Sequence, residues 1–189
     1  MKLISQIILK ILGWELESQL PVVNKYVLIG YPHTSNWDFI IGMLAKWAMG
    51  MPLNWVAKRS MFWGPLRPLF IAMGGVPINR HKSSGFIQKS IALFQCRNHF
   101  ILGLMPEGTR SKTAGFKTGF YYIADGAHVP IALAYLDYKN KKIGVGKVLN
   151  TSGDIEKDFE IIKTFYQNIV GCNPENQSEL VPIKMKSKK

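Results

Sequence analysis

A histidine and an aspartate, His33 and Asp38, lie where one apolar run gives way to another. The run 26–30 predicts a buried strand, and 39–45 predicts the body of a helix. A histidine titrates near neutral pH and can take a proton from an alcohol, and a carboxylate on its far nitrogen would fix its tautomer. The spacing of Ser35 and Asp38 is also typical of a helix capping box, so a purely capping role for Asp38 remains open.

Three other stretches place polar residues where a predicted strand ends. Lys58 lies near the end of 53–60, Arg80 closes 74–80, and the run 99–105 is followed by Glu107, Gly108, Thr109 and Arg110. In α/β sheets, ligands bind beyond the carboxyl ends of the strands. If these ends meet at one edge, a general base lies beside several cations, which suits an alcohol that also carries a phosphate.

The predicted elements alternate between strands and helices along the chain. Short apolar runs predict buried strands, and longer stretches with apolar residues at helical spacing predict the helices between them. We therefore expect an α/β fold: a single domain with a mostly parallel central sheet flanked by helices. The stretch 141–149 predicts an edge strand. We divide the chain into an N-terminal amphipathic helix region (1–20), a main domain (21–175) and a basic C-terminal tail (176–189).

Residues 1–14 predict an amphipathic helix. Their apolar side chains recur at helical spacing, while Lys2 and Lys10 fall mostly on the opposite side. With these lysines and Trp14 at its end, the helix could lie in a membrane interface. Packing on the rest of the domain is an equally good interpretation. The apolar stretch 61–70 is a second candidate for contact with lipid, because exposed apolar patches usually mark interaction sites.

The composition fits one globular domain with an anionic partner. The chain has 189 residues, 47% of them hydrophobic, and a net charge of +12. This charge predicts binding to a phosphorylated substrate, an anionic lipid surface or nucleic acid. Cys96 and Cys172 form neither a disulfide framework nor a zinc pattern, so we expect a reducing compartment and no metal site. We also expect neither a membrane-spanning helix nor a signal peptide.

Four sequence blocks together resemble those of a known enzyme family. HTSNWD at 33–38 has an H-x4-D pattern, GGVPINR at 74–80 ends in an arginine, and MPEGTRS at 105–111 and VPIALAY at 129–135 follow in order. They resemble the blocks of the glycerolipid acyltransferases, the PlsC-like group that includes the 1-acyl-glycerol-3-phosphate acyltransferases. The H-x4-D pattern alone is weakly specific, whereas four ordered blocks over most of the domain are strongly specific.

The resemblance implies a catalytic role for the first block. His33 would be the general base that activates the hydroxyl of the acceptor, and Asp38 would orient the imidazole and balance its charge. The activated oxygen would attack an acyl thioester directly, without an acyl-enzyme. A donor must then stabilise the thioester oxygen as it gains charge. Backbone amides near His33 or Gly108 are candidates for that donor.

The resemblance also implies which residues bind the acceptor. Arg110 and Lys58 would bind its phosphate, with help from Arg80, and an arginine fork on phosphate is a strong, charge-assisted contact. The residues Glu107 and Gly108, together with Thr109 of the same block, would shape the acceptor site. The histidines outside the first block match no block of the family.

The implied substrates are an acyl thioester, either acyl-CoA or acyl carrier protein, and a lyso-phospholipid acceptor, with no bound cofactor. The implied location is the cytoplasmic face of the cell membrane, with a peripheral or monotopic attachment through 1–14 and the candidate segment 61–70. The unusual middle of the second block, 77–79, leaves open a lyso-aminolipid acceptor. The net charge alone leaves open a non-enzymatic protein that binds anionic membrane or nucleic acid. Because no nucleic-acid-binding motif is present, we expect no nucleic acid as partner.

Overall fold

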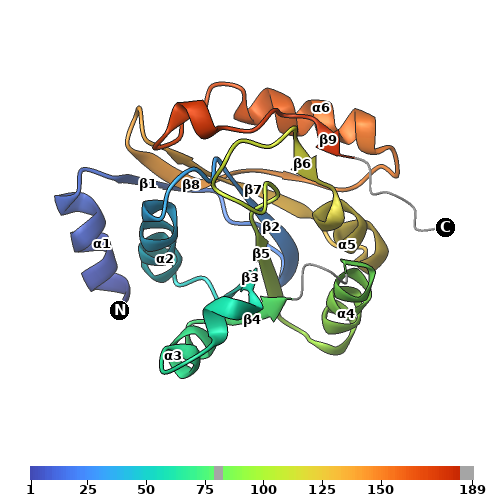
Figure 1. The fold of residues 1–189 in the computed structure, drawn as a ribbon, viewed down its shortest axis with the longest axis horizontal. Helices are drawn as coiled ribbons and strands as arrows, with labels where there is room; N and C mark the ends of the chain where they lie inside the picture. Colours follow the sequence, from blue (N-terminus) through green and yellow to red (C-terminus); the bar gives the residue numbers. More distant parts are fainter. Residues whose placement is uncertain (79–82, 184–189) are drawn as a thin grey trace.

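A seven-stranded sheet forms the centre of the computed structural model, which describes residues 1–78 and 83–183 (Figure 1). The strand order is β1-β8-β7-β2-β5-β3-β4, and all neighbours are parallel except β7 and β8. The strands are β1 (Glu15–Ser18), β2 (Lys25–Tyr31), β3 (Leu53–Lys58), β4 (Gly75–Ile78), β5 (Phe100–Leu104), β7 (Ile131–Asp137) and β8 (Lys142–Leu149). A separate pair joins β6 (Phe116–Lys117) to β9 (Pro182–Ile183). The predicted α/β fold with a mostly parallel sheet is therefore confirmed.

Within the described ranges, six α-helices and two short 3₁₀ helices accompany these strands. They are α1 (Lys2–Ile11), α2 (Trp37–Met49), η1 (Arg59–Phe62), α3 (Arg67–Ala72), α4 (Ser83–Cys96), α5 (Gly119–Ala127), α6 (Ile155–Tyr166) and η2 (Pro174–Asn176). Two expectations need correction. The apolar run 61–73, which predicts a single helix, instead contains a bend and turn at 63–66, with Gly64 at φ +82°, between η1 and α3. The strand at 141–149 is not at the edge, because β1 pairs with β8 on its outer side.

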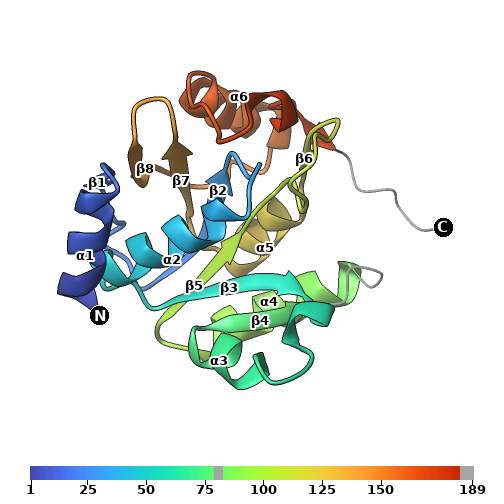
Figure 2. The same ribbon diagram turned by 60° about the vertical axis from the view of Figure 1, so that its left-hand side comes forward.

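The central strand β2 is buried on both faces, which explains why its sequence is a continuous apolar run rather than an alternating one. Val27, Ile29 and Tyr31 belong to the core that α4, α5 and α6 form on one face. Tyr26 and Leu28 belong to the core of the other face. On that side α2 covers the sheet, and α1 lies beside α2 (Figures 1 and 2).

The N-terminal helix α1 forms as predicted, but its apolar face points away from the protein. Leu3, Ile7 and Ile11 are 69%, 50% and 77% exposed. Ser5 and Leu9 are the buried residues of α1, on the side that packs against α2. The helix therefore does pack on the domain, through Ser5 and Leu9, while most of its apolar side chains stay exposed. No helix in the described ranges has the length and apolar content needed to cross a bilayer.

The orientation of α1 predicts opposite outcomes for two substitutions in the same helix. Replacing the buried Leu9 with alanine leaves a cavity against α2, so we expect a loss of about 2–4 kcal/mol in the free energy of unfolding. Replacing the exposed Ile7 with alanine is expected to change it by less than about 0.5 kcal/mol. Urea denaturation of both variants measures this difference. A larger effect at Ile7 than at Leu9 would mean that α1 is turned the other way.

Candidate active site

Three adjacent parallel strands bring together the residues that surround His33. In the sheet, β2 lies between β7 and β5. Tyr31 of β2 pairs with Tyr135 of β7, and Ile29 of β2 pairs with Leu104 of β5. His33 follows the carboxyl end of β2, Glu107 follows that of β5, and Tyr138 follows that of β7. The loops after β2, β5 and β7 therefore lie at the same edge of the sheet, which is where α/β folds bind ligands.

His33 and Asp38 form the predicted pair. The Nδ1 atom of His33 lies 3.1 Å from Oδ2 of Asp38. Asp38 is almost fully buried, whereas His33 is partly accessible at the surface. Because an ionised carboxylate only accepts hydrogen bonds, Nδ1 carries the proton and Nε2 is left as the basic nitrogen. The pair can therefore act as an oriented general base.

Asp38 also holds the backbone of the loop on which His33 lies. Its Oδ2 atom accepts hydrogen bonds from the amides of Thr34 at 2.7 Å and Ser35 at 2.8 Å. The Ser35 hydroxyl in turn accepts from the amide of Trp37 at 3.2 Å. The purely capping interpretation is therefore wrong, because Asn36 is the N-cap of α2 and makes no side-chain cap hydrogen bond, whereas the Asp38 carboxylate orients the imidazole and binds two amides that precede the helix.

The second carboxylate oxygen of Asp38 has a partner that the sequence motif does not contain. The hydroxyl of Tyr138 donates to Oδ1 of Asp38 at 2.8 Å. Burial raises the pKa of Asp38, but the hydrogen bonds from His33, the Ser35 amide and Tyr138 outweigh it, so the pKa lies below its ordinary value. Asp38 is therefore charged at neutral pH and can stabilise an imidazolium on His33.

Glu107 is the other buried carboxylate at this edge, and it supports the His33 loop from the side of β5. Its Oε2 atom accepts from the amide of His33 at 2.7 Å, and its Oε1 atom accepts from the amide of Ser178 at 3.3 Å. Burial raises its pKa, and the hydrogen bonds from Ser178 and the His33 amide offset only part of this effect. Since the side chain is completely buried, it does not present itself to an acceptor. It holds the His33 loop in place, and its implied role in shaping the acceptor site stays a prediction.

The segment 171–178 after α6 packs against the catalytic loop. Asn173 donates two hydrogen bonds to Thr34. Its backbone amide donates to Oγ1 of Thr34 at 3.1 Å, and its side-chain amide donates to the carbonyl of Thr34 at 2.8 Å. Gly171 comes so close that a Cβ atom there would lie 2.9 Å from Oγ1 of Thr34. The carbonyl of Ser178 accepts from the hydroxyl of Tyr31 at 3.1 Å. Residues 176–183, which we had assigned to a basic tail, therefore include part of the support of the site.

The predicted acceptor-binding residues lie on the same edge but not in the buried network. Lys58 ends β3 and Arg110 lies in the loop after β5, and both are exposed. Gly108 adopts φ +68°, and a Cβ atom there would lie 2.7 Å from Nζ of Lys117, so the loop brings a further ammonium close to its backbone. Thr109 accepts from the amide of Ser111 at 3.4 Å. Arg80 lies outside the described residues.

The backbone amides that we named as donors to the thioester oxygen are already engaged. Those of His33, Thr34 and Ser35 donate to the two buried carboxylates. That of Gly108 donates to the carbonyl of Met105 at 3.0 Å. The expectation that one of them stabilises the developing charge is therefore not supported, because each would first have to break a hydrogen bond within the protein.

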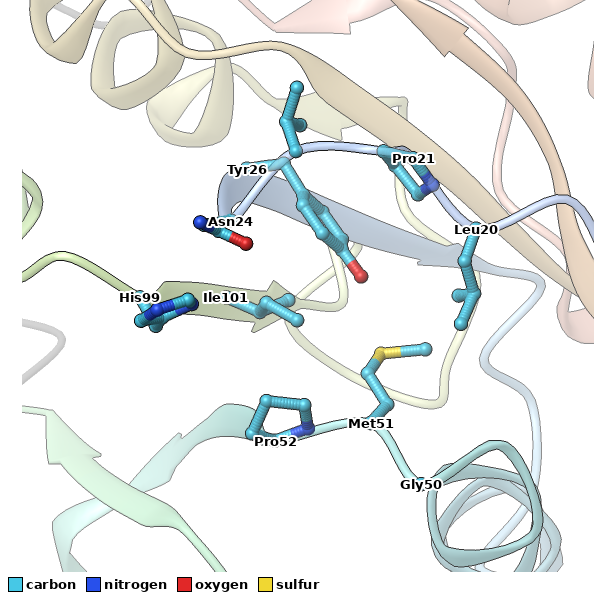
Figure 3. Close-up of a pocket in the computed structure, with 10 residues that line it drawn as sticks. Leu20, Pro21, Asn24, Tyr26, Gly50, Met51, Pro52, His99 and Ile101 are labelled. Atoms are coloured by element: carbon cyan, nitrogen blue, oxygen red, sulfur yellow. The ribbon is translucent and has the colours of Figure 1, made fainter.

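A pocket of about 190 Å³ lies at the opposite ends of the strands (Figure 3). It is lined by residues that precede or begin β2, β3 and β5, among them Asn24, Tyr26, Pro52 and His99. Burial raises the pKa of Tyr26 to about 12. Because the central strands run parallel, this pocket lies at their amino ends, away from His33 and Asp38. It is not the catalytic site.

Comparison with known proteins identifies the class to which this fold and site belong. The profile of the Acyltransferase family matches residues 15–135. The crystal structure of the 1-acyl-sn-glycerophosphate (LPA) acyltransferase PlsC from Thermotoga maritima superposes with a TM-score of 0.58 over 89% of this chain and 74% of that one, at 16% identity. That likeness establishes the shared fold. The chain belongs to the acyltransferase family.

Curated relatives agree with this assignment. The 1-acyl-sn-glycerol-3-phosphate acyltransferase of Escherichia coli (strain K12) is 31% identical over 125 residues, which cover 62% of this chain and 49% of the relative. The enzyme of the same name from Cocos nucifera is 33% identical over 94 residues, which cover 47% of this chain and 30% of the relative. The chain thus spans about half the length, or less, of the curated relatives it matches.

Sequence reasoning missed Tyr138 and the segment 171–178. The stretch 138–141 has the composition of a polar turn, and Tyr138 directly follows β7. A polar aromatic residue at the carboxyl end of a predicted strand is a weak signal, and it points to the His33 loop only once β7 is known to lie beside β2. The segment 171–178 offered no comparable signal, because its contacts with 31–34 cross more than 130 positions of sequence.

The support from Glu107 predicts a catalytic defect when its charge is removed. In E107Q, the glutamine side chain has one acceptor oxygen for the two backbone N–H groups of His33 and Ser178, so one hydrogen bond to a charged group is lost. We therefore expect E107Q to lower kcat about tenfold. E179Q, at an exposed neighbouring position, is the matched control. Steady-state assays with circular dichroism check both. Wild-type kcat in a folded E107Q would show that the His33 amide needs no such partner.

Proposed function

We propose that this protein transfers a fatty acyl group from a thioester, acyl-CoA or acyl carrier protein, to the hydroxyl of a lyso-phospholipid such as 1-acyl-glycerol-3-phosphate. The observation that carries this proposal is the His33–Asp38 pair, 3.1 Å apart at the carboxyl edge of the sheet, with the carboxylate held charged and buried. The membership of the chain in the acyltransferase family supports the reaction class. It also favours an enzyme over a nucleic-acid-binding protein.

The proposed reaction needs one proton transfer in each direction. Nε2 of His33 takes the proton of the acceptor hydroxyl while that oxygen forms a bond to the thioester carbonyl carbon. Asp38 stabilises the imidazolium that results. When the tetrahedral intermediate collapses, the carbon–sulfur bond breaks and the thiolate takes the proton back from His33. The products are an ester and a free thiol, and no group of the protein becomes acylated.

The phosphate of the acceptor is assigned to the exposed cations at the same edge. Arg110 follows the loop that carries Glu107, and Lys58 ends β3, two strands away from β2. Neither forms an ion pair within the described part of the chain. A guanidinium and an ammonium placed in this way can bind a phosphate without first leaving a protein carboxylate.

We further propose a peripheral attachment to the cytoplasmic face of the membrane. Other large apolar residues are also exposed, with Trp37 at 60% and Ile40 at 46% on α2 and Trp63 at 88% after η1. An apolar helix face flanked by lysines suits the interface of an anionic bilayer. Because Trp37 directly precedes Asp38, a lyso-lipid whose chain stays in the bilayer could bring its hydroxyl to His33.

The reaction and its base can be tested in one assay. Purified protein with detergent-dispersed lysophosphatidate and a long-chain acyl-CoA should release thiol, and H33A should reduce the rate by at least about a hundredfold because the general base is lost. H99A, at the opposite end of the sheet, should retain wild-type turnover. Undiminished release by H33A would exclude His33 as the base.

The same assay separates the two candidate acceptors. R110M should raise KM for lysophosphatidate about tenfold, through loss of a charge-assisted contact, and leave KM for the thioester unchanged. Acyl carrier protein as donor and a lyso-aminolipid as acceptor complete the panel. Turnover of the aminolipid alone, unaffected by R110M, would replace the phosphate acceptor by an aminolipid.

Membrane attachment predicts a specific pattern in vesicle flotation. Wild type should float with vesicles that contain anionic phospholipid, and a variant that combines I7D with I11D should float at least about tenfold less, because two charges then enter the apolar face. V22D, a charge at an exposed apolar position outside α1, is the control. Equal flotation of all three proteins would mean that α1 is not the attachment site.

A further inference from the structure

Tyr138 connects two parts of the protein that are far apart in sequence. On one side its hydroxyl donates to Oδ1 of Asp38 at 2.8 Å. On the other side its ring meets Trp14 edge to face, with ring centroids 5.0 Å apart and planes at 88°. Trp14 lies just beyond the end of α1 and is buried, and its amide donates to the carbonyl of Leu9 in that helix at 2.8 Å. A continuous path of contacts thus runs from α1 to the catalytic carboxylate.

Several contacts fix the position of the Tyr138 ring. The backbone amide of Tyr138 donates to the carbonyl of Val170 at 2.8 Å. Nζ of Lys141 lies 5.2 Å from the Trp14 ring centroid and 6.0 Å from that of Tyr138, so one cation faces both rings. The amide of Glu15 donates to the carbonyl of Lys141 at 2.8 Å and ties the chain after α1 to the same turn. The hydroxyl is therefore directed at Asp38 by packing on both sides.

We propose that Tyr138 is a positioning residue for acyl transfer, which holds Asp38 through Oδ1 and is itself held by Trp14 at the end of α1. The expected effect of Tyr138 on the rate of acyl transfer rests on the proposed function. It adds that the exposed helix α1, which we assign to the lipid surface, is mechanically linked to the general base. A shift of α1 would move Trp14, then Tyr138, and then the carboxylate that orients His33.

The chemistry of the carboxylate explains why this contact matters for the reaction. Oδ2 of Asp38 already accepts from His33, Thr34 and Ser35, so Oδ1 is the oxygen whose partner can set the rotation of the carboxylate plane. Without the Tyr138 hydroxyl, Oδ1 keeps a buried negative charge without that donor, and the carboxylate can turn toward water. His33 would then be less well oriented at the moment when it takes the proton.

The test is a double-mutant cycle with Y138F and W14L. Y138F should lower kcat about tenfold, as expected for one hydrogen bond to a charged group, and leave KM for both substrates within about twofold. W14L should lower kcat in the wild-type background and have little further effect in Y138F, because it acts through Tyr138. Y121F is the matched control, since Tyr121 also donates to a buried carboxylate at 2.8 Å, that of Asp158 in α6. Additive effects of W14L and Y138F on kcat would overturn the link.

A second readout does not depend on turnover. The proton on Nδ1 of His33, hydrogen-bonded to Asp38, can be followed by nuclear magnetic resonance in protein with labelled histidine. Its resonance should shift in Y138F and in W14L, although Trp14 does not touch Asp38, and should stay in place in Y121F. An unshifted resonance in folded Y138F overturns the inference. A shifted resonance in a protein that acylates no acceptor of the panel supports the inference and contradicts the proposed function.

If Y138F does not fold, as judged by circular dichroism, W14L decides the question alone. A shift of the His33 proton then supports the path through Tyr138, and an unchanged resonance contradicts it. The coupling to lipid is measured as the ratio of kcat on anionic vesicles to kcat on monomeric short-chain substrates. That ratio should exceed one in the wild type and approach one in W14L. An equal ratio in both proteins would show that α1 does not affect the base.

Discussion

The buried charge of Asp38 is the constraint on which the catalytic loop depends. A carboxylate removed from water is costly unless donors replace its hydration, and Asp38 is almost fully buried. The donors come from His33 and the two amides that follow it, and from Tyr138 in the turn after β7. To supply them, residues 33–35 must curl back over the start of α2. The same geometry that satisfies the charge therefore orients the imidazole.

Glu107 applies the same principle to a second loop, with a different electrostatic outcome. It receives two backbone amides and the hydroxyl of Ser178, whereas Asp38 receives an imidazole, two amides and a phenol. Burial therefore prevails at Glu107 and raises its pKa, while the donors prevail at Asp38 and lower its pKa. Together the two carboxylates join the loops after β2, β5 and β7 to the segment 171–178. Hydrogen bonds to two buried carboxylates thus connect several segments that are distant in sequence.

Local sequence was sufficient for the parts of this arrangement that lie within one strand-loop-helix unit. His33 and Asp38 could be placed because an apolar strand, a polar loop and a helix follow one another within 26–45. The role of Glu107 could not be assigned, since its partners are backbone amides that no side-chain pattern reveals. The contact of Tyr138 with Asp38 depends on β7 lying beside β2. The direction in which the apolar face of α1 points depends on how α1 packs against α2. Periodicity identifies an apolar face but not the direction in which it points.

The start of α2 joins the buried chemistry to the exposed apolar surface. Asp38 faces inward to the loop, while Trp37 and Ile40, one and two positions away, are 60% and 46% exposed. Successive helical positions are about 100° apart, so one turn can present a charge to the interior and apolar side chains to the outside. A bilayer against Trp37 would therefore lie within one helical turn of Asp38, the carboxylate that pairs with His33. In the proposed function, this arrangement would let a lyso-lipid acceptor react while its chain remains in the membrane.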